Sequence, residues 1–240
     1  MPPRSRELSF KRRLLRWFRA NGRDLPWRAT RDPYRILVSE FMLQQTQVSR
    51  VQDFYPRFLR RFPTLADLAR ARPSRVREAW DGLGYYRRAA NLHALARTVV
   101  RDHAGTIPDD PAALEQLPGV GRYTAGAVAA FAYERRVPAV DTNVARVLRR
   151  VFRRTERRKD GPADRRKAGR RGNRPPAQPP THHLWSLAER LLPTDRRVAW
   201  EFGQALMDLG ATVCLARKPK CGICPVRAVC GTGRRKNVST

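Results

Sequence analysis

Four cysteines are the residues whose type and spacing point most clearly to chemistry. They are the only cysteines among 240 residues and occur as Cys214, Cys221, Cys224 and Cys230. Disulfides of secreted proteins are usually spread through the fold, whereas thiols gathered within seventeen residues indicate a metal site. Four thiolates at this spacing can enclose a [4Fe–4S] cluster. Structural zinc is the alternative, although zinc ribbons usually pair two CxxC knuckles and this chain has one.

A glycine-containing turn is a candidate phosphate-binding site. The string LPGVGRYTAG, residues 117–126, joins two expected helices and contains Gly119 and Gly121. Two glycines spaced by one residue let the backbone turn tightly and expose successive N–H groups, and the next helix adds its positive dipole end. Such a turn binds phosphate without base specificity. An ordinary turn between two helices is the alternative.

Two carboxylates are candidates for catalysis. Asp141 lies about twenty residues after the turn, in the string VPAVDTNVARV. Glu40 lies in the apolar string ILVSEFML, where desolvation favours the protonated acid. A helix N-cap is the alternative role for Asp141, and a solvated position in the first turn of a helix is the alternative for Glu40.

The overall charge indicates nucleic acid as the partner. The formal net charge is +29, and 30% of the residues are charged. Such a chain is too basic for a protein whose main partners are neutral metabolites. No segment approaches eighteen apolar residues, and the N-terminus lacks the apolar core of a secretion signal. We therefore expect a cytoplasmic, nucleoid-associated monomer that does not bind membranes.

The elements expected to position these residues are all helices. Apolar residues recur at helical spacing, no period-2 strand stands out, and the interruptions carry Pro, Gly or Asp. Helices are predicted over residues 7–20, 36–47, 51–61, 64–71, 73–83, 86–103, 112–117, 123–133, 184–192 and 198–209, and after Asp141. Residues 153–183 contain eleven cationic, three anionic and few apolar residues, which predicts a disordered basic insertion.

Taken together, these motifs resemble the helix-hairpin-helix Gly/Pro-Asp DNA glycosylases. The LPGVG turn and Asp141 have the separation found in that superfamily, and the cysteine spacing is similar to that of endonuclease III and of MutY-type adenine glycosylases. The MutY type is favoured by PWRATRDPYRILVSEFMLQQTQV at residues 26–48, and by GLGYY at 82–86 and NLH at 91–93. The resemblance covers roughly residues 8–152 and 184–231.

The resemblance implies an all-α fold with two helical subdomains and an active site in the cleft between them. A six-helix barrel domain is expected at residues 27–136, with the helix-hairpin-helix at 112–133. An iron–sulfur cluster domain is expected from residues 1–26 plus 137–231, with a flexible tail at 232–240.

The resemblance also implies a reaction, the hydrolysis of the N-glycosidic bond of adenine mispaired with 8-oxoguanine or guanine. This reaction needs protonation of the leaving base and stabilisation of an oxocarbenium-like sugar, which two carboxylates in unlike environments can divide. In this family pattern Glu40 is the general acid, Asp141 stabilises the sugar, Tyr123 assists it and Asn143 holds the geometry of the site. Lyases of the superfamily carry a nucleophilic Lys where this chain has Tyr123, and a neutral Tyr cannot form a Schiff base. We therefore predict a monofunctional glycosylase.

The implied partner is double-stranded DNA that contains a mismatch or an oxidised base, and the target base must leave the stack. Gln44, Gln45 and Tyr85 match family positions that fill the vacated stack or contact the opposite base. Arg28 and Gln204 match positions that line the adenine pocket. For Gln44, Gln45 and Tyr85, ordinary polarity of a surface helix or loop is the alternative. For Gln204, the alternative is a simple residue of an amphipathic helix.

Two other functions stay open. MutY-type proteins usually continue past the cluster into a second domain that reads 8-oxoguanine, whereas this sequence ends ten residues after Cys230. Shorter relatives include thymine glycosylases, which also resemble this chain at the GVG-x-Tyr position, so removal of thymine or uracil opposite guanine is one alternative. A non-catalytic DNA-binding module is the other.

Overall fold

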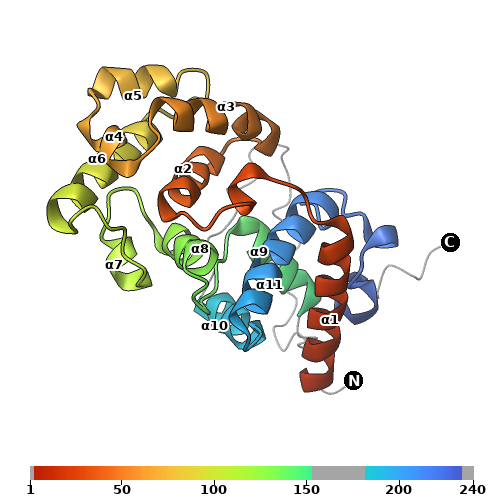
Figure 1. Cartoon of the computed structure of the whole chain (residues 1–240). Coiled ribbons are helices and arrows are strands. Elements are labelled where there is room, and N and C mark those ends of the chain that lie inside the picture. The colour runs from red at the N-terminus through yellow and green to blue at the C-terminus, as the bar shows by residue number, and fades with distance from the viewer. Residues whose placement is uncertain (1–2, 153–181, 234–240) are drawn as a thin grey trace, which may run out of the picture. The chain divides into compact units, whose positions relative to one another are not determined.

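The computed structural model describes residues 3–152 and 182–233, and every regular element within these ranges is helical (Figure 1). The all-α prediction is confirmed. The α-helices are α1 (Pro3–Asn21), α2 (Pro33–Leu43), α3 (Val48–Arg61), α4 (Leu65–Arg70), α5 (Pro73–Ala79), α6 (Arg87–Asp102), α7 (Pro111–Glu115), α8 (Arg122–Ala132), α9 (Thr142–Val151), α10 (His182–Leu191) and α11 (Arg196–Asp208). The short 3-10 helices are η1 (Pro26–Arg28), η4 (Cys221–Ile223) and η5 (Arg227–Val229), and η3 (Leu209–Val213) is a π-helix that follows α11. In the described part of the chain, no helix is long and apolar enough to cross a membrane.

The chain divides into two compact units. We call the first the cysteine unit, which comprises residues 1–22, 140–191 and 204–240 as far as they are described. The second, which we call the hairpin unit, comprises residues 23–139 and 192–203. The division passes through α11, so the two ends of one helix belong to different units.

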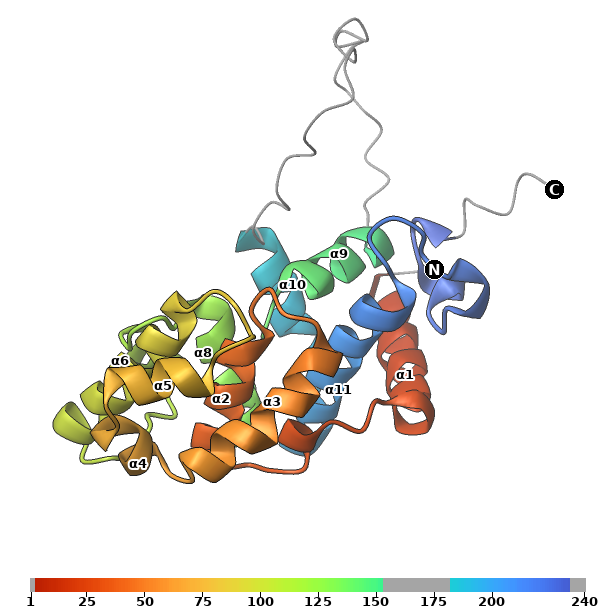
Figure 2. The ribbon, with the colours of Figure 1, turned by 90° about the horizontal axis from the view of Figure 1, so that it is seen from above.

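The hairpin unit is built from amphipathic helices whose ends are fixed by local capping. Helix α2 begins at Pro33 because the carboxylate of Asp32 accepts hydrogen bonds from the backbone N–H groups of Tyr34 and Arg35, at 2.9 and 3.3 Å. Helices α4 and α6 pack together, as do α2 and α8 (Figure 2). Phe58 and Trp80 are almost fully buried and meet edge to face at 5.6 Å between ring centroids. Burial of each such side chain stabilises the fold by roughly 1.5–3 kcal/mol.

The cysteine unit joins the first helix of the chain to its last described loop. Phe10 and Leu14 of α1 are fully buried, and the ring of Phe10 contacts that of Phe152 at 5.1 Å. The guanidinium of Arg6 donates a hydrogen bond to the carbonyl oxygen of Val229 at 2.8 Å and another to the carbonyl oxygen of Val151. Helix α1 is therefore held against both the end of α9 and the loop that carries the cysteines.

The predicted helix over residues 36–47 was wrong at its C-terminal end. Helix α2 ends at Leu43, because Gln44 leaves helical geometry with ψ 111° and Gln45 has φ 58°. The sequence offers no Gly or Pro at this point, so a local stop signal is missing. The reason is tertiary, since the side chain of Arg88 donates hydrogen bonds to the carbonyl oxygens of Phe41 and Met42 at the end of α2.

The expected basic insertion at residues 153–183 lies outside the described residues except for His182 and His183, which form the start of α10. The expected tail at 232–240 likewise lies outside them except for Thr232 and Gly233. The backbone N–H of Thr232 donates to the carbonyl oxygen of Arg150 at 3.1 Å, which ties the start of this segment to α9.

Candidate active site and metal centre

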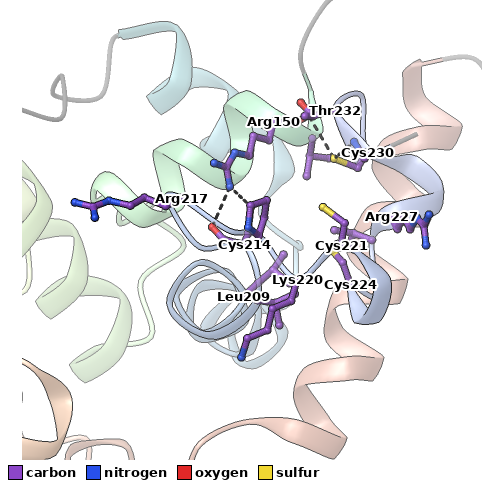
Figure 3. Close-up of a pocket in the computed structure, with 15 residues that line it drawn as sticks. Arg150, Leu209, Cys214, Arg217, Lys220, Cys221, Cys224, Arg227, Cys230 and Thr232 are labelled. Carbon is purple, nitrogen blue, oxygen red and sulfur yellow. Dashed lines mark hydrogen bonds between the residues drawn. The ribbon is translucent and has the colours of Figure 1, made fainter. Parts of the chain in front are cut away.

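The four cysteines line one cavity of about 150 Å³ in the cysteine unit (Figure 3). All four are half-buried free thiols. Apolar side chains complete part of the wall, contributed by Leu209, Val213 and Val226. Among the described residues, no three His, Cys, Asp or Glu side chains converge as the ligands of a single metal ion do. A chamber of this size, with four thiols around it, fits an inorganic cluster that spans the space between its ligands.

Hydrogen-bond donors lie close to two of the four cysteine sulfurs. Nη1 of Arg150 lies 3.3 Å from Sγ of Cys214, and the backbone N–H of Gly233 lies 3.2 Å from Sγ of Cys230 (Figure 3). Such donors can form hydrogen bonds to the sulfurs that would ligate an iron–sulfur cluster. Burial raises the pKa of the Cys224 thiol to about 11, so binding of a metal must displace its proton. Arg150 also donates to the carbonyl oxygens of Leu215 and Ala216, which fixes the loop between the first two cysteines.

Asp141 is a helix N-cap and also part of a polar cluster. Its Oδ1 accepts a hydrogen bond from the backbone N–H of Val144 at 2.6 Å, which caps α9, and its Oδ2 accepts one from Nδ2 of Asn143 at 2.8 Å. The structure thus brings Asp141 and Asn143 together, and both stay partly accessible.

A chain of hydrogen bonds runs from this cap to the cysteine loop. Arg146 donates from Nη2 to Oδ1 of Asn143 at 2.7 Å and from Nε to the carbonyl oxygen of Cys214 at 2.8 Å. Its Nη2 also donates to the carbonyl oxygen of Gly210 at 2.7 Å. Gly210 must lack a side chain, because an added Cβ would lie 2.8 Å from Cβ of Asn143. Asp141, Asn143, Arg146 and Cys214 are therefore one connected network.

The hairpin unit holds the other expected catalytic residues. Glu40 is 5% exposed near the end of α2, so the solvated first-turn alternative is wrong. Tyr123 is half-buried at the second position of α8, which packs against α2.

The two residues expected to line the adenine pocket belong to different units. Arg28, in η1 of the hairpin unit, donates to the carbonyl oxygen of Arg23 at 2.8 Å. Gln204 belongs to the cysteine unit and is 5% exposed in α11, so it is not a surface residue of that helix.

The two glycines of the turn have different structural roles. Gly119 has φ 76°, and an added Cβ would lie 2.7 Å from Cβ of Asn91, so only glycine fits there. Gly121 is exposed, has ordinary extended geometry as the N-cap of α8, and has open space where a Cβ would be. The N-terminus of this eleven-residue helix is therefore open to a ligand.

Gln44, Gln45 and Tyr85 lie on two loops of the hairpin unit. Gln45 and the 60% exposed Tyr85 both have positive φ, 58° and 47°. This conformation costs roughly 1–2 kcal/mol for a residue with a side chain. Surroundings that hold the backbone must offset that cost.

Sequence reasoning missed three arginines that organise these sites, Arg88, Arg146 and Arg150. Arginine is mostly exposed in proteins, and in a chain with 50 cationic residues no arginine stands out by its type. The only available signal was position, because Arg146 and Arg150 are four residues apart in the helix expected after Asp141 and so share one face of it.

Two segments of the chain match known protein families. Residues 38–171 match the HhH-GPD superfamily of base excision DNA repair proteins, and residues 214–230 match the iron–sulfur binding domain of endonuclease III. The cofactor of the cysteine cavity is therefore a [4Fe–4S] cluster.

Two curated relatives are both described as adenine DNA glycosylases. That of Mycobacterium tuberculosis (strain CDC 1551 / Oshkosh) is 48% identical over 214 residues, covering 89% of this chain and 64% of the relative. That of Rattus norvegicus is 42% identical over 236 residues, covering 95% of this chain and 42% of the relative. The chain thus spans less than two thirds of the length of either.

Solved structures share the fold over nearly the whole chain. A thermostable thymine-DNA glycosylase is 30% identical with a TM-score of 0.80, covering 97% of this chain and 98% of that one. A trapped endonuclease III–DNA covalent intermediate is 21% identical with a TM-score of 0.75, which is likeness of fold alone.

Proposed function

The chain belongs to the HhH-GPD superfamily of base excision DNA repair proteins, and from this premise we propose that it is a monofunctional adenine DNA glycosylase. Its substrate is double-stranded DNA in which adenine is mispaired with 8-oxoguanine or guanine, and the protein acts as a monomer associated with the nucleoid. The observation that carries the proposal is the 41–48% identity, over about nine tenths of the chain, to bacterial and mammalian adenine DNA glycosylases.

Glu40 is the general acid of the proposed reaction. A carboxyl group that is 5% exposed on an apolar helix is favoured in its protonated form, which supports proton donation to the leaving base. As the C1′–N bond breaks, a water oxygen bonds to C1′. The proton released by that water restores the acid form of Glu40.

Asp141 stabilises the oxocarbenium-like sugar. Its carboxylate is held by the backbone amide of Val144 and by the side chain of Asn143, so it can present negative charge without reorganisation. Tyr123 assists at the same step through its hydroxyl group. Because Tyr123 carries no amine, the reaction stops at the abasic site and the strand stays intact.

The remaining residues bind DNA and the extruded base. The exposed backbone at Gly119 and Gly121 binds a phosphate at the N-terminus of α8. Gln45 and Tyr85, with Gln44 beside them, fill the vacated stack or contact the opposite base. Arg28 and Gln204 line the adenine pocket. When bound, the [4Fe–4S] cluster supplies four iron–thiolate bonds that cross-link the loop over residues 214–230.

A second candidate substrate is thymine opposite guanine. The observation in its favour is the likeness to the thermostable thymine-DNA glycosylase, which this chain matches over 98% of that protein's length.

Base excision from four labelled duplexes separates these candidates. The duplexes contain A·8-oxoguanine, A·G, T·G or U·G at one position, and the abasic product is revealed by alkali. We expect excision from the first two. Excision from T·G or U·G alone would assign the protein to the thymine candidate. Tight binding of cluster-loaded protein to mismatched duplexes with no excision from any of them would identify a non-catalytic DNA-binding module.

A further inference from the structure

Arg88, a residue outside the proposed catalytic set, connects the two loops that carry Gln45 and Tyr85. It lies in the first turn of α6 and is 7% exposed. Its Nη1 donates to the carbonyl oxygens of Phe41 at 3.0 Å, Met42 at 2.7 Å and Gln44. Its Nη2 donates to the carbonyl oxygens of Leu83 at 3.2 Å and Gly84 at 3.1 Å. We call residues 44–47 the Gln loop and residues 82–86 the Tyr loop.

These contacts replace hydrogen bonds that the backbone cannot make by itself. The last carbonyl groups of a helix have no amide partners within it, and here the guanidinium group satisfies two of them at the end of α2. The planar guanidinium group has several donors and can reach both loops at once. The compact ammonium group of a lysine cannot make this set of contacts. The Tyr loop has further support, because Nε1 of Trp80 donates to the carbonyl oxygen of Gly84 at 3.3 Å.

The contacts fall next to the strained residues. The described chain has four non-glycine residues with positive φ, and Gln45 and Tyr85 are two of them. The carbonyl group immediately before each of the two, on Gln44 and on Gly84, accepts a hydrogen bond from Arg88. The guanidinium carbon also lies 5.4 Å from the centre of the Tyr85 ring. One side chain therefore fixes the peptide that sets the direction of each exposed residue.

We propose that Arg88 is a positioning residue that holds the Gln loop and the Tyr loop in one fixed arrangement, so that Gln45 and Tyr85 engage mismatched duplex DNA together. This inference rests on the proposed function for its DNA ligand, whereas the clamp itself is a property of the free protein. With this role of Arg88, discrimination between mismatched and matched duplex depends on a residue that does not itself contact DNA. An unclamped pair of loops would pay an ordering cost at each encounter with DNA.

The test compares Arg88→Lys with a matched control, Arg136→Lys. Arg136 likewise donates to backbone carbonyl oxygens, those of Pro193 at 2.9 Å and Leu192 at 3.2 Å, but it lies outside both loops. Amide hydrogen exchange is measured on the free, cluster-loaded protein. In Arg88→Lys we expect exchange to accelerate by about tenfold in both loops, while the helices keep their protection. The control should match the unaltered protein. Unchanged exchange in either loop would overturn the proposal.

The second arm measures the ratio of affinities for A·8-oxoguanine and matched duplexes, in Arg88→Lys and in a Gln45→Ala/Tyr85→Ala background. As a single substitution, Arg88→Lys should lower this affinity ratio by about tenfold. Added to the Gln45→Ala/Tyr85→Ala variant, which lacks the side chains that Arg88 positions, it should lower the ratio by less than about twofold. Equal losses in both would indicate general destabilisation and overturn the proposal. If no mismatch is preferred by the unaltered protein, the proposed function fails, and the exchange measurement still decides whether Arg88 clamps the loops.

Discussion

Nε of Arg146 lies 2.8 Å from the carbonyl oxygen of Cys214, and the same guanidinium group donates to Asn143. One side chain thus links the first cluster ligand to the amide that orients the carboxylate of Asp141. Burial lowers the pKa of Arg146, while the nearby Cys214 thiol acts in the opposite direction. The proposed catalytic carboxylate and the cluster loop therefore share a support.

Replacing Arg146 by Met should damage both ends of this link. The carbonyl groups of Cys214 and Gly210 lose charged donors, and each such loss costs about 1–3 kcal/mol. We expect a lower melting temperature, less iron per chain and slower excision, measured by calorimetry, iron analysis and single-turnover kinetics. Arg149→Met, on the exposed side of the same helix, is the control and should change none of these by much. Full iron content with an unchanged excision rate would contradict the role of Arg146.

Asp141→Asn and Glu40→Gln should each abolish most base excision and spare duplex binding. Loss of the charge at residue 141 removes electrostatic stabilisation worth about 10²–10³-fold in rate, and loss of the acid at residue 40 removes about 10²–10⁴-fold. Asn is as good an N-cap as Asp, so α9 should keep its stability in the first variant. Excision at saturating enzyme and binding of undamaged duplex are measured in parallel. Either variant with the normal rate would refute the two-carboxylate assignment.

The reaction product should be an abasic site in an unbroken strand. Tyr123 offers no amine, so borohydride should trap no covalent complex between protein and DNA. Tyr123→Lys places an amine at the second position of α8, and we expect it to give a trapped adduct that is absent with Tyr123→Phe. Gel electrophoresis before and after alkali, with and without borohydride, reads both outcomes. Efficient trapping by the unaltered protein would exclude a monofunctional mechanism.

The two glycines of the turn should separate stability from DNA binding. Gly119→Ala forces a Cβ to within 2.7 Å of Asn91 at a positive φ, and overpacking of this kind costs about 1–3 kcal/mol. Gly121→Ala meets open space in the folded protein, but its methyl group stands at the exposed helix start where a phosphate would bind. We expect a lower melting temperature only for Gly119→Ala, and weaker duplex binding for both. Normal DNA affinity of Gly121→Ala would argue against phosphate binding at this turn.

The sequence predicted the elements but not the contacts that set their ends. Helical periodicity is local, so the helices, the turn around Gly119 and the N-cap at Asp141 could be read from neighbouring residues. The cysteine spacing is local too, and it led to the cluster. The end of α2 depends on Arg88, which lies 47 residues from Phe41 in the sequence. Every residue has a backbone carbonyl group, so the sequence does not show which distant carbonyl groups accept hydrogen bonds from Arg88.

The bond between Arg6 and Val229 has a consequence for synthesis on the ribosome. The two residues are 223 positions apart, so α1 emerges first and finds its partner only when almost the whole described chain has been made. Residues 23–139 of the hairpin unit are contiguous and can begin to pack much earlier. Contacts of such high contact order form slowly, because the closing of a long loop costs entropy before any contact repays it. Nascent chains stalled before residue 229 should therefore leave α1 with its contacts to Val151 and Phe152 but without the bond to Val229, and its full protection from protease should appear as the cysteine loop leaves the exit tunnel.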